Sequence, residues 1–216
     1  MEKKAGWTAF LDVYGYSKMI EKESTTDTAE KMLAIQVEVS SKFSKLTSYA
    51  FFSDSVFLFS RDCDLTIASS EEALDRVIAC VKAFMAAAIK QQIFSRGSTA
   101  YGELSIAPNI MVGRPIIRAY RCEQSLAYPI VVVPAKELIL GGIDTYLPCL
   151  PVETKQGLVL AHPIFPHENS GFMNIAEAYM NDTLIEGPDS VALSWKKYLE
   201  FAEKTKSRIK AQEGIN

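Results

Sequence analysis

The sequence predicts an α+β fold, with a ferredoxin-like βαββαβ core and a C-terminal extension. Short runs of strand-forming residues alternate with longer segments in which apolar residues recur at helical spacing. The polar pair Ser53-Asp54 separates two strand-like runs, as the turn of a β-hairpin does. No internal repeat or low-complexity linker divides the 216 residues. We therefore expect a single domain over residues 1–216, with its core at about 7–133.

The first half of the core is predicted to contain a strand, a helix and a hairpin. Residues 7–13 (WTAFLDV) form a short apolar run typical of a strand, which the YGYS segment ends. Helical spacing of apolar residues then predicts a helix over 24–45. Residues 46–52 and 55–60 are the two strands of the predicted hairpin.

The second half of the core adds two helices with a strand between them. A long helix begins at Ser69 or Ser70, where a serine N-cap precedes two glutamates, and its apolar stripe continues to Ile89. Residues 98–107 have the character of a strand, and residues 113–127 that of a third helix.

The C-terminal part is less regular after one last strand. Residues 128–133 are a continuous apolar run rich in β-branched side chains, which predicts a strand covered on both faces. Prolines punctuate the chain beyond it, so an irregular extension is expected over about 134–216. Within that extension, an amphipathic helix is predicted from about 188 to 212.

Composition argues against several classes of partner. Hydrophobic residues make up 48% of the chain and the formal net charge is −3, so no strong positive field favours nucleic acid or an anionic membrane. No apolar run approaches the roughly 18 residues that a membrane-spanning helix needs. The four cysteines are scattered, away from His162 and His167, which argues against a zinc site and for buried thiols in a reducing compartment. We expect a cytoplasmic protein without a nucleic-acid or membrane partner.

Asp12 and Asp54 lie in apolar surroundings, where a carboxylate needs a compensating partner. Asp12 stands between Leu11 and Val13 at the end of the first predicted strand, and Asp54 lies in the turn of the predicted hairpin. Two such acids at one end of a sheet would form an oxygen-rich site suited to Mg²⁺ or Mn²⁺. The alternative is that Asp54 is a turn former and Asp12 a helix N-cap, and spacing alone leaves both interpretations open.

Four segments resemble, in the same order, motifs of the class III adenylyl and guanylyl cyclases. FLDVYGYS (10–17) resembles their first metal-binding motif, and FFSDSVFLF (51–59) resembles the second, in a β-hairpin. RGSTAYGELSIA (96–107) is similar to the strand that follows. VGRPIIRAYRCEQS (112–125) is similar to the helix with the family's transition-state arginine. The resemblance covers roughly residues 7–133 and implies a nucleotidyl cyclase core.

This resemblance assigns roles to the residues around the two acids. Asp12 and Asp54 would bind two divalent cations per site, Mn²⁺ or Mg²⁺, and Val13 would add its backbone carbonyl. Helix N-terminal N–H groups favour phosphate. Three residues at the start of the next helix would therefore lie beneath the triphosphate: Gly15, Tyr16 and Ser17.

The resemblance also implies two arginines and a second subunit. Arg121 aligns with the arginine that stabilises transition-state charge, and Arg118 lies one turn earlier on the helix. Without the resemblance, such helical arginines are more often solvent-facing ion-pair residues. The family builds its sites between two domains, so a chain with both sets of residues implies a homodimer with two shared active sites.

The purine-recognition residues of the family are missing from this sequence. Ile117 stands where the family has a ribose-binding Asn, and Ala50 stands where it has the adenine-selecting Lys. Ile110 lies near the position of the acid that partners that Lys. Because hydrogen bonds are what discriminate strongly between substrates, the changes at Ala50 and Ile110 disfavour ATP and GTP.

Tyr49, Phe51 and Arg96 are the candidate replacements in the base pocket, although Tyr49 and Arg96 could equally be core and ion-pair residues. The compact domain, with Arg96-Gly97, Ala119-Tyr120 and the missing purine pair, resembles the pyrimidine cyclases of the Pycsar antiphage system. Those enzymes make cyclic UMP or cyclic CMP for a partner effector. A guanidinium donor suits the carbonyl acceptors of uracil better than the amino group of cytosine. The predicted substrate is therefore UTP, with CTP next, and a product-sensing effector is expected on another chain.

Other functional classes stay open. A diguanylate-cyclase-like or polymerase-palm-like nucleotidyl transferase would share the βαββαβ core and two-metal chemistry. The hairpin carries FFSDS, however, where a GG-[DE]-[DE]-F motif would be expected. A non-catalytic nucleotide-binding module of the same fold would not need both acids. A purine nucleotide cyclase is a further alternative.

Overall fold

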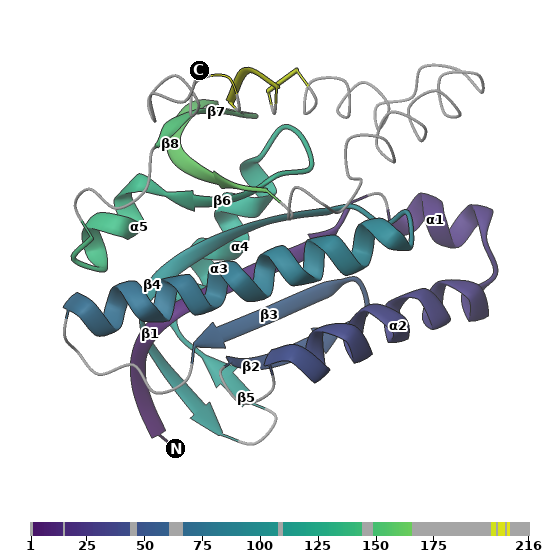
Figure 1. The fold of residues 1–216 in the computed structure, drawn as a ribbon, viewed down its shortest axis with the longest axis horizontal. Helices are drawn as coiled ribbons and strands as arrows, with labels where there is room; N and C mark the ends of the chain where they lie inside the picture. The colour runs from purple at the N-terminus through teal and green to yellow at the C-terminus, as the bar shows by residue number, and fades with distance from the viewer. Residues whose placement is uncertain are drawn as a thin grey trace.

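The computed structural model describes residues 2–14, 16–43, 47–60, 67–107, 110–143 and 149–165, together with 200, 201, 203–205 and 207. Strands and helices alternate along this part of the chain (Figure 1). In chain order the elements are β1 (Glu2–Val13), α1 (Tyr16–Lys22), α2 (Thr25–Phe43), β2 (Thr47–Phe52), β3 (Ser55–Ser60), α3 (Ile67–Lys90), β4 (Ser95–Ala107), β5 (Ile110–Val112), α4 (Arg114–Ser125), β6 (Val131–Pro134), α5 (Ala135–Leu140), β7 (Leu150–Thr154) and β8 (Gly157–Ile164).

One mixed sheet contains these strands. Its order is β2-β3-β1-β4-β6-β8-β7, and the short strand β5 pairs with β4. Neighbouring strands are antiparallel except β4 and β6, which are parallel and connected through α4. The segment from β1 to β4 has the βαββαβ order, so the predicted ferredoxin-like α+β core is confirmed.

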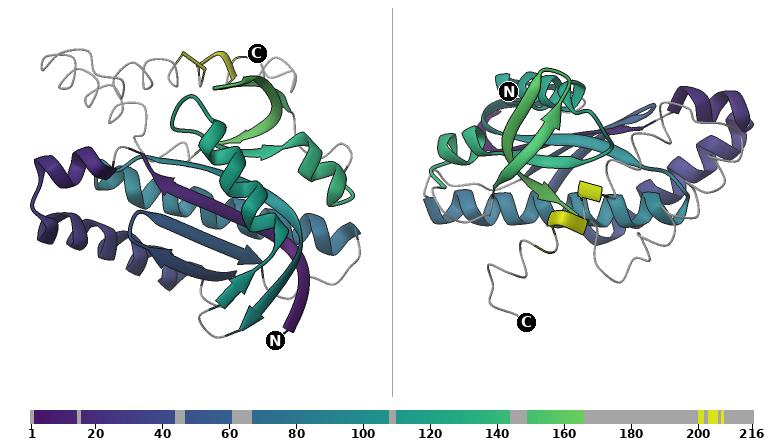
Figure 2. Two further views of the ribbon diagram at one scale, coloured as in Figure 1. Left: turned by 180° about the vertical axis from the view of Figure 1, so that it is seen from behind. Right: turned by 90° about the horizontal axis from the view of Figure 1, so that it is seen from above.

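The two faces of the sheet are covered by different helices. Because side chains alternate along a strand, Trp7 and Leu11 of β1 point into the main core, which α2 and α3 close. Phe10 points to the other face, where it packs with Ala100 of β4 and Ala119 of α4. The rear view in Figure 2 shows α4 crossing β1 and β4 on the face opposite α3. We call the face that α4 occupies the α4 face.

The segment over residues 134–165, expected to be irregular, contains α5 and the β7–β8 hairpin. The hairpin extends the sheet beyond β6. Its prolines do not prevent pairing. Pro151 is exposed on the edge strand β7. Pro163 of β8 lies beyond Ala161, the last residue of β8 that pairs with β7, and is itself paired with Val132 of β6. Val152 is buried in a second hydrophobic cluster with β6 and β8. The prediction of an irregular extension is therefore wrong for this segment.

Smaller differences concern the ends of elements. The structure adds α1 and β5, which the sequence pattern did not predict, and β1 begins at Glu2 rather than at residue 7. The helix predicted over about 188–212 lies mostly outside the described residues, and the described positions between 200 and 207 are helical. None of the helices in the described part of the chain combines the length and apolar character that crossing a membrane requires.

Candidate active site

The two predicted metal ligands, Asp12 and Asp54, meet at one end of the sheet. Asp12 lies near the end of β1, on the α4 face, directly opposite Ser55 of β3. Asp54 occupies the two-residue turn between β2 and β3, in which Ser53 has a φ of 52°. The N–H of Val13 donates a hydrogen bond of 2.9 Å to the carbonyl oxygen of Asp54, which holds this turn against the end of β1.

A single hydroxyl group contacts both carboxylates. Ser55 Oγ lies 3.3 Å from Asp12 Oδ1 and 3.4 Å from Asp54 Oδ1. The pKa of Asp12 is raised from 3.8 to about 6, first by burial and then by the negative charges of Glu123 and Asp54. Two close, partly desolvated carboxylates repel each other until a cation binds between them. The donor set therefore fits a hard divalent ion such as Mg²⁺ or Mn²⁺.

The raised pKa of Asp12 leads to a stability prediction for the cation-free protein. A folded-state pKa of about 6 against an ordinary value of 3.8 means that folding stability falls as pH rises between those values. Asp12→Asn should then stabilise the cation-free protein by about 1–2 kcal/mol at about pH 8, after allowance for solvent screening, and have little effect at about pH 4. Denaturant unfolding at both pH values in the presence of EDTA measures this. An Asn variant less stable than wild type at the higher pH would contradict it.

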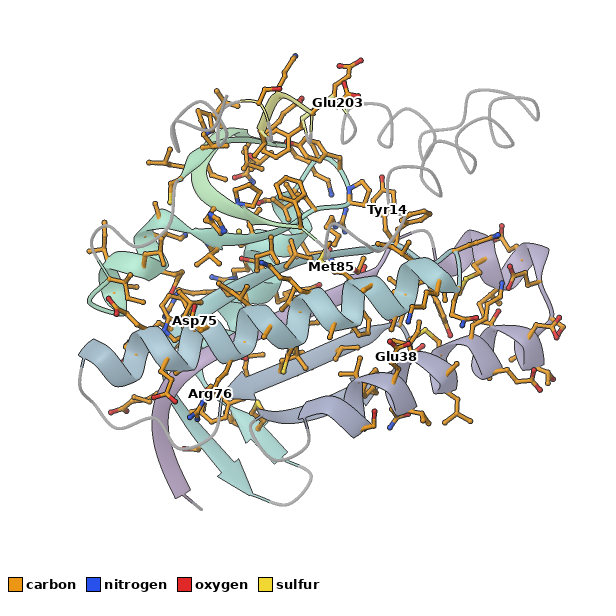
Figure 3. All side chains as sticks on the ribbon, viewed as in Figure 1. Tyr14, Glu38, Asp75, Arg76, Met85 and Glu203 are labelled. Carbon is orange, nitrogen blue, oxygen red and sulfur yellow. The ribbon has the colours of Figure 1, made fainter. Side chains whose placement is uncertain are left out.

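A buried ion pair that the sequence did not reveal lies beside Asp12. Arg96 of β4 is directly opposite Asp12 in the β1–β4 register, yet its Nε donates to Glu123 Oε1 of α4 at 2.5 Å. Its guanidinium also lies 5.3 Å from the ring centroid of Tyr14, the residue that follows β1 and is labelled in Figure 3. Glu123 is 0% exposed. It is placed on the inward stripe of α4 by its spacing of four from the buried Ala119, and that spacing was the available signal.

The two arginines predicted to be catalytic have different surroundings. Arg118 donates to both carboxylate oxygens of Glu137 in α5, at 2.8 and 3.0 Å, and to the carbonyl oxygen of Tyr101. Its guanidinium therefore connects α4 to α5 and β4 within one subunit, which differs from the catalytic role predicted for it. Arg121 is exposed on the same helix.

Phe51, one of the candidate base-pocket residues of β2, is not on the face that Asp12 occupies. Phe51 is paired with Val56, packs against the main core, and has its ring centroid 6.3 Å from that of Phe84. Tyr49 is paired with Leu58, and its side chain lies outside the described residues. Assigning Phe51 to a base pocket was therefore wrong, because alternation along β2 turns it into the core.

An aromatic cluster lies instead on the α4 face. The ring centroid of Phe10 is 4.8 Å from that of Phe57 in β3 and 5.4 Å from that of Tyr120 in α4. Ala50 is paired with Phe57, so alternation places it on this face as well. Tyr120 is 47% exposed, and Ile117, one turn earlier on α4, is 51% exposed. Apolar and aromatic side chains thus continue outward from this face.

Tyr16, one of the three predicted phosphate-binding residues, lies next to the turn that carries Asp54. Tyr16 begins α1, and its hydroxyl accepts a hydrogen bond of 3.4 Å from Ser53 Oγ. Ser17 is exposed in the first turn of α1, and Gly15 lies outside the described residues. The assignment of these three residues to the triphosphate stays a prediction.

Solved structures that share this fold are catalytic domains of nucleotide cyclases. The catalytic core of a rhodopsin-guanylyl cyclase with converted specificity, in complex with ATPαS, has a TM-score of 0.56 and 13% identity, over 77% of this chain and all of that one (100%). The guanylyl cyclase domain of the RhoGC fusion protein from Blastocladiella emersonii has a TM-score of 0.55 and 13% identity, over 77% and 99%. The adenylyl cyclase CyaB from P. aeruginosa has a TM-score of 0.50 and 15% identity, over 79% and 99%.

The chain has the fold of a cyclase catalytic domain. No protein-family model matches the sequence, and no curated protein matches it. The structural likeness therefore concerns the fold.

Proposed function

We propose that the protein is a nucleotidyl cyclase that converts a nucleoside triphosphate to its 3′,5′-cyclic monophosphate and diphosphate. The observation that carries the proposal is the convergence of Asp12 and Asp54 on Ser55 in a chain with a cyclase fold. In the reaction the 3′-oxygen forms a bond to the α-phosphorus, the bond to the leaving diphosphate breaks, and the 3′-hydroxyl proton is lost. Divalent cations held there would neutralise charge on the triphosphate and favour ionisation of the 3′-hydroxyl.

The residues of this chain would divide the remaining work. Asp12 and Asp54 hold the cations, with the Val13 carbonyl as a further oxygen ligand. Arg121 offsets the charge that develops on the α-phosphate and the leaving diphosphate. An exposed arginine on the α4 face can serve a second copy of the chain, which supports a homodimer with two shared sites.

The test is conversion of each of the four nucleoside triphosphates by the purified protein with Mn²⁺ or Mg²⁺, analysed by chromatography. We expect a cyclic monophosphate that forms only when the divalent cation is present. A non-catalytic nucleotide-binding module of the same fold would bind nucleotide without forming product, and that result would contradict the proposal.

We propose a pyrimidine triphosphate as the substrate. Ala50 offers no side-chain donor on the α4 face, and Phe57, which is paired with it, fills space beside it, which favours the smaller ring. A preference for uracil over cytosine requires the Arg96 guanidinium to contact the base. That guanidinium is bonded to Glu123 instead. UTP and CTP are therefore equal candidates on this geometry, and cyclic UMP or cyclic CMP would serve as the messenger for an antiphage effector on another chain.

Competition between the four triphosphates at equal concentration measures the base preference. The pyrimidine products should together exceed the purine products, because no hydrogen-bonding side chain at position 50 rewards a purine. A dominant cyclic AMP or cyclic GMP peak would contradict the pyrimidine proposal and leave the cyclase proposal intact.

A further inference from the structure

Arg96 forms its ion pair with Glu123 rather than with Asp12, the carboxylate opposite it in the sheet. It stands opposite Asp12 in the β1–β4 register, so both side chains leave the sheet on the α4 face. An arginine beside a carboxylate ordinarily forms an ion pair with it. In the part of the chain that the structure describes, Arg96 and Asp12 form no such pair, and Arg96 binds Glu123 instead. Asp12 receives a hydrogen bond from the Ser55 hydroxyl.

The surroundings of Glu123 suit it to hold this arginine. The Glu123 side chain is 0% exposed and that of Arg96 is 12% exposed. Each charge is therefore shielded from water, and its opposite partner compensates for the lost hydration. Gln124 Nε2 donates to the second oxygen of Glu123 at 2.8 Å. Burial raises the pKa of Glu123, and the positive charge of Arg96 opposes that rise. The stacking on Tyr14 restrains the guanidinium from a further side.

We infer that Glu123 is a positioning residue, which holds the Arg96 guanidinium away from Asp12 and so keeps that carboxylate available to a divalent cation. The inference rests on the proposed two-metal function. If Glu123 loses its charge, Arg96 keeps its own and remains in register with Asp12. A guanidinium bound to Asp12 would neutralise it and compete with the cation for the same oxygen atoms.

The electrostatics of Asp12 support this arrangement. Arg96 is opposite Asp12 in the β1–β4 register and Glu123 is bound to Arg96, so both charges of the pair lie near this carboxylate. Removing the two together removes one positive and one negative charge. The net field at Asp12 then changes little, whereas removing Glu123 alone leaves an unpaired positive charge beside it.

The experiment measures binding of Mn²⁺ alone to the full-length protein, by electron paramagnetic resonance of the free ion, with no nucleotide present. Glu123→Gln should weaken Mn²⁺ binding about 10- to 100-fold, the loss typical when a partner of a metal ligand is changed. The double variant Arg96→Met/Glu123→Gln should return Mn²⁺ affinity close to that of wild type. A purely structural role for the pair predicts no such recovery, because the double variant also lacks the ion pair.

Glu137→Gln is the matched control. Glu137 is also a buried glutamate bound to an arginine, but it pairs with Arg118 next to Tyr101, well along β4 from Arg96. This variant should lose stability in thermal unfolding and keep its Mn²⁺ affinity. Equal weakening in Glu123→Gln and Glu137→Gln would show a general effect of lost stability and overturn the inference.

The outcomes separate this inference from the proposed function. Equal Mn²⁺ affinity in wild type and folded Glu123→Gln would overturn the inference alone. Absence of Mn²⁺ binding by wild type would overturn the two-metal function and the inference with it. If Glu123→Gln does not fold, the Mn²⁺ affinity of the double variant decides. Wild-type affinity supports the inference. A loss of about tenfold or more, the lower limit expected when a needed partner is removed, overturns it.

Discussion

Asp54→Ala should abolish cyclase activity while leaving the fold intact. Asp54 lies in a hairpin turn, and its carboxylate contacts the hydroxyl of Ser55 at 3.4 Å. Losing that contact costs little, since the substitution also removes the negative charge that raises the pKa of Asp12. The free energy of unfolding should change by less than about 1 kcal/mol. Turnover should fall at least about 10³-fold, because the cations that act on the transition-state charge lose a ligand.

Asp27→Ala is the control for this substitution. Asp27 is an exposed acid in the first turn of α2, a helix packed on the opposite face of the sheet from α4. Initial rates with saturating Mn²⁺, and thermal unfolding of both variants, separate catalysis from folding. A folded Asp54→Ala protein with near wild-type turnover would refute the two-metal assignment.

The sequence predicts that Asp12 and Asp54 lie close together, because the position of each acid depends on local rules. An acid near the end of an apolar strand and an acid in a two-residue turn are visible in the pattern itself. Once β3 pairs with β1, the register opposite Ser55 brings the two carboxylates together. The order of the βαββαβ core follows from the same local signals.

The base pocket and the ion pairs depend on information that the pattern lacks. Ala50 and Phe51 are neighbours in the sequence. Only the β2–β3 register shows that Ala50 lies on the α4 face and Phe51 in the core. Glu123 and Glu137 come from helices and reach Arg96 and Arg118 across long sequence separations. Their pairing therefore follows from tertiary packing rather than from spacing.

The strands β7 and β8 at the edge of the sheet were not predicted, for a related reason. The prolines after residue 133 favour irregular structure in the sequence pattern, yet Pro151 lies on the edge strand β7, where proline is tolerated, and Pro163 of β8 still pairs with Val132 of β6. The burial of Leu150, Val152 and Thr154, with Pro151 and Glu153 exposed between them, has the alternation of a strand with one face on the core.

Arg121 should stabilise the transition state of the site on the partner subunit. Arg121 is exposed, and so is Arg114 on the same helix, so neither substitution to alanine should change stability by more than about 0.5 kcal/mol. Arg121→Ala should lower turnover about 10²- to 10³-fold, as loss of one charge-stabilising donor does. Arg114→Ala is the matched control and should keep near wild-type turnover, because charge at the start of α4 lies two turns from Arg121.

Mixing inactive Asp54→Ala and Arg121→Ala proteins tests whether the arginine acts across the subunit interface. If the sites are shared, each mixed dimer has one site with both substitutions and one site with neither. Random exchange of equal amounts makes half of the dimers mixed, each with one of two sites intact, so turnover should recover to about one quarter of the wild-type value. If Arg121 acts within its own subunit, every site in the mixture lacks one group and no activity returns. Subunit exchange is confirmed by native mass spectrometry, and absence of recovery after exchange would place Arg121 in the same site as the Asp54 of its own chain.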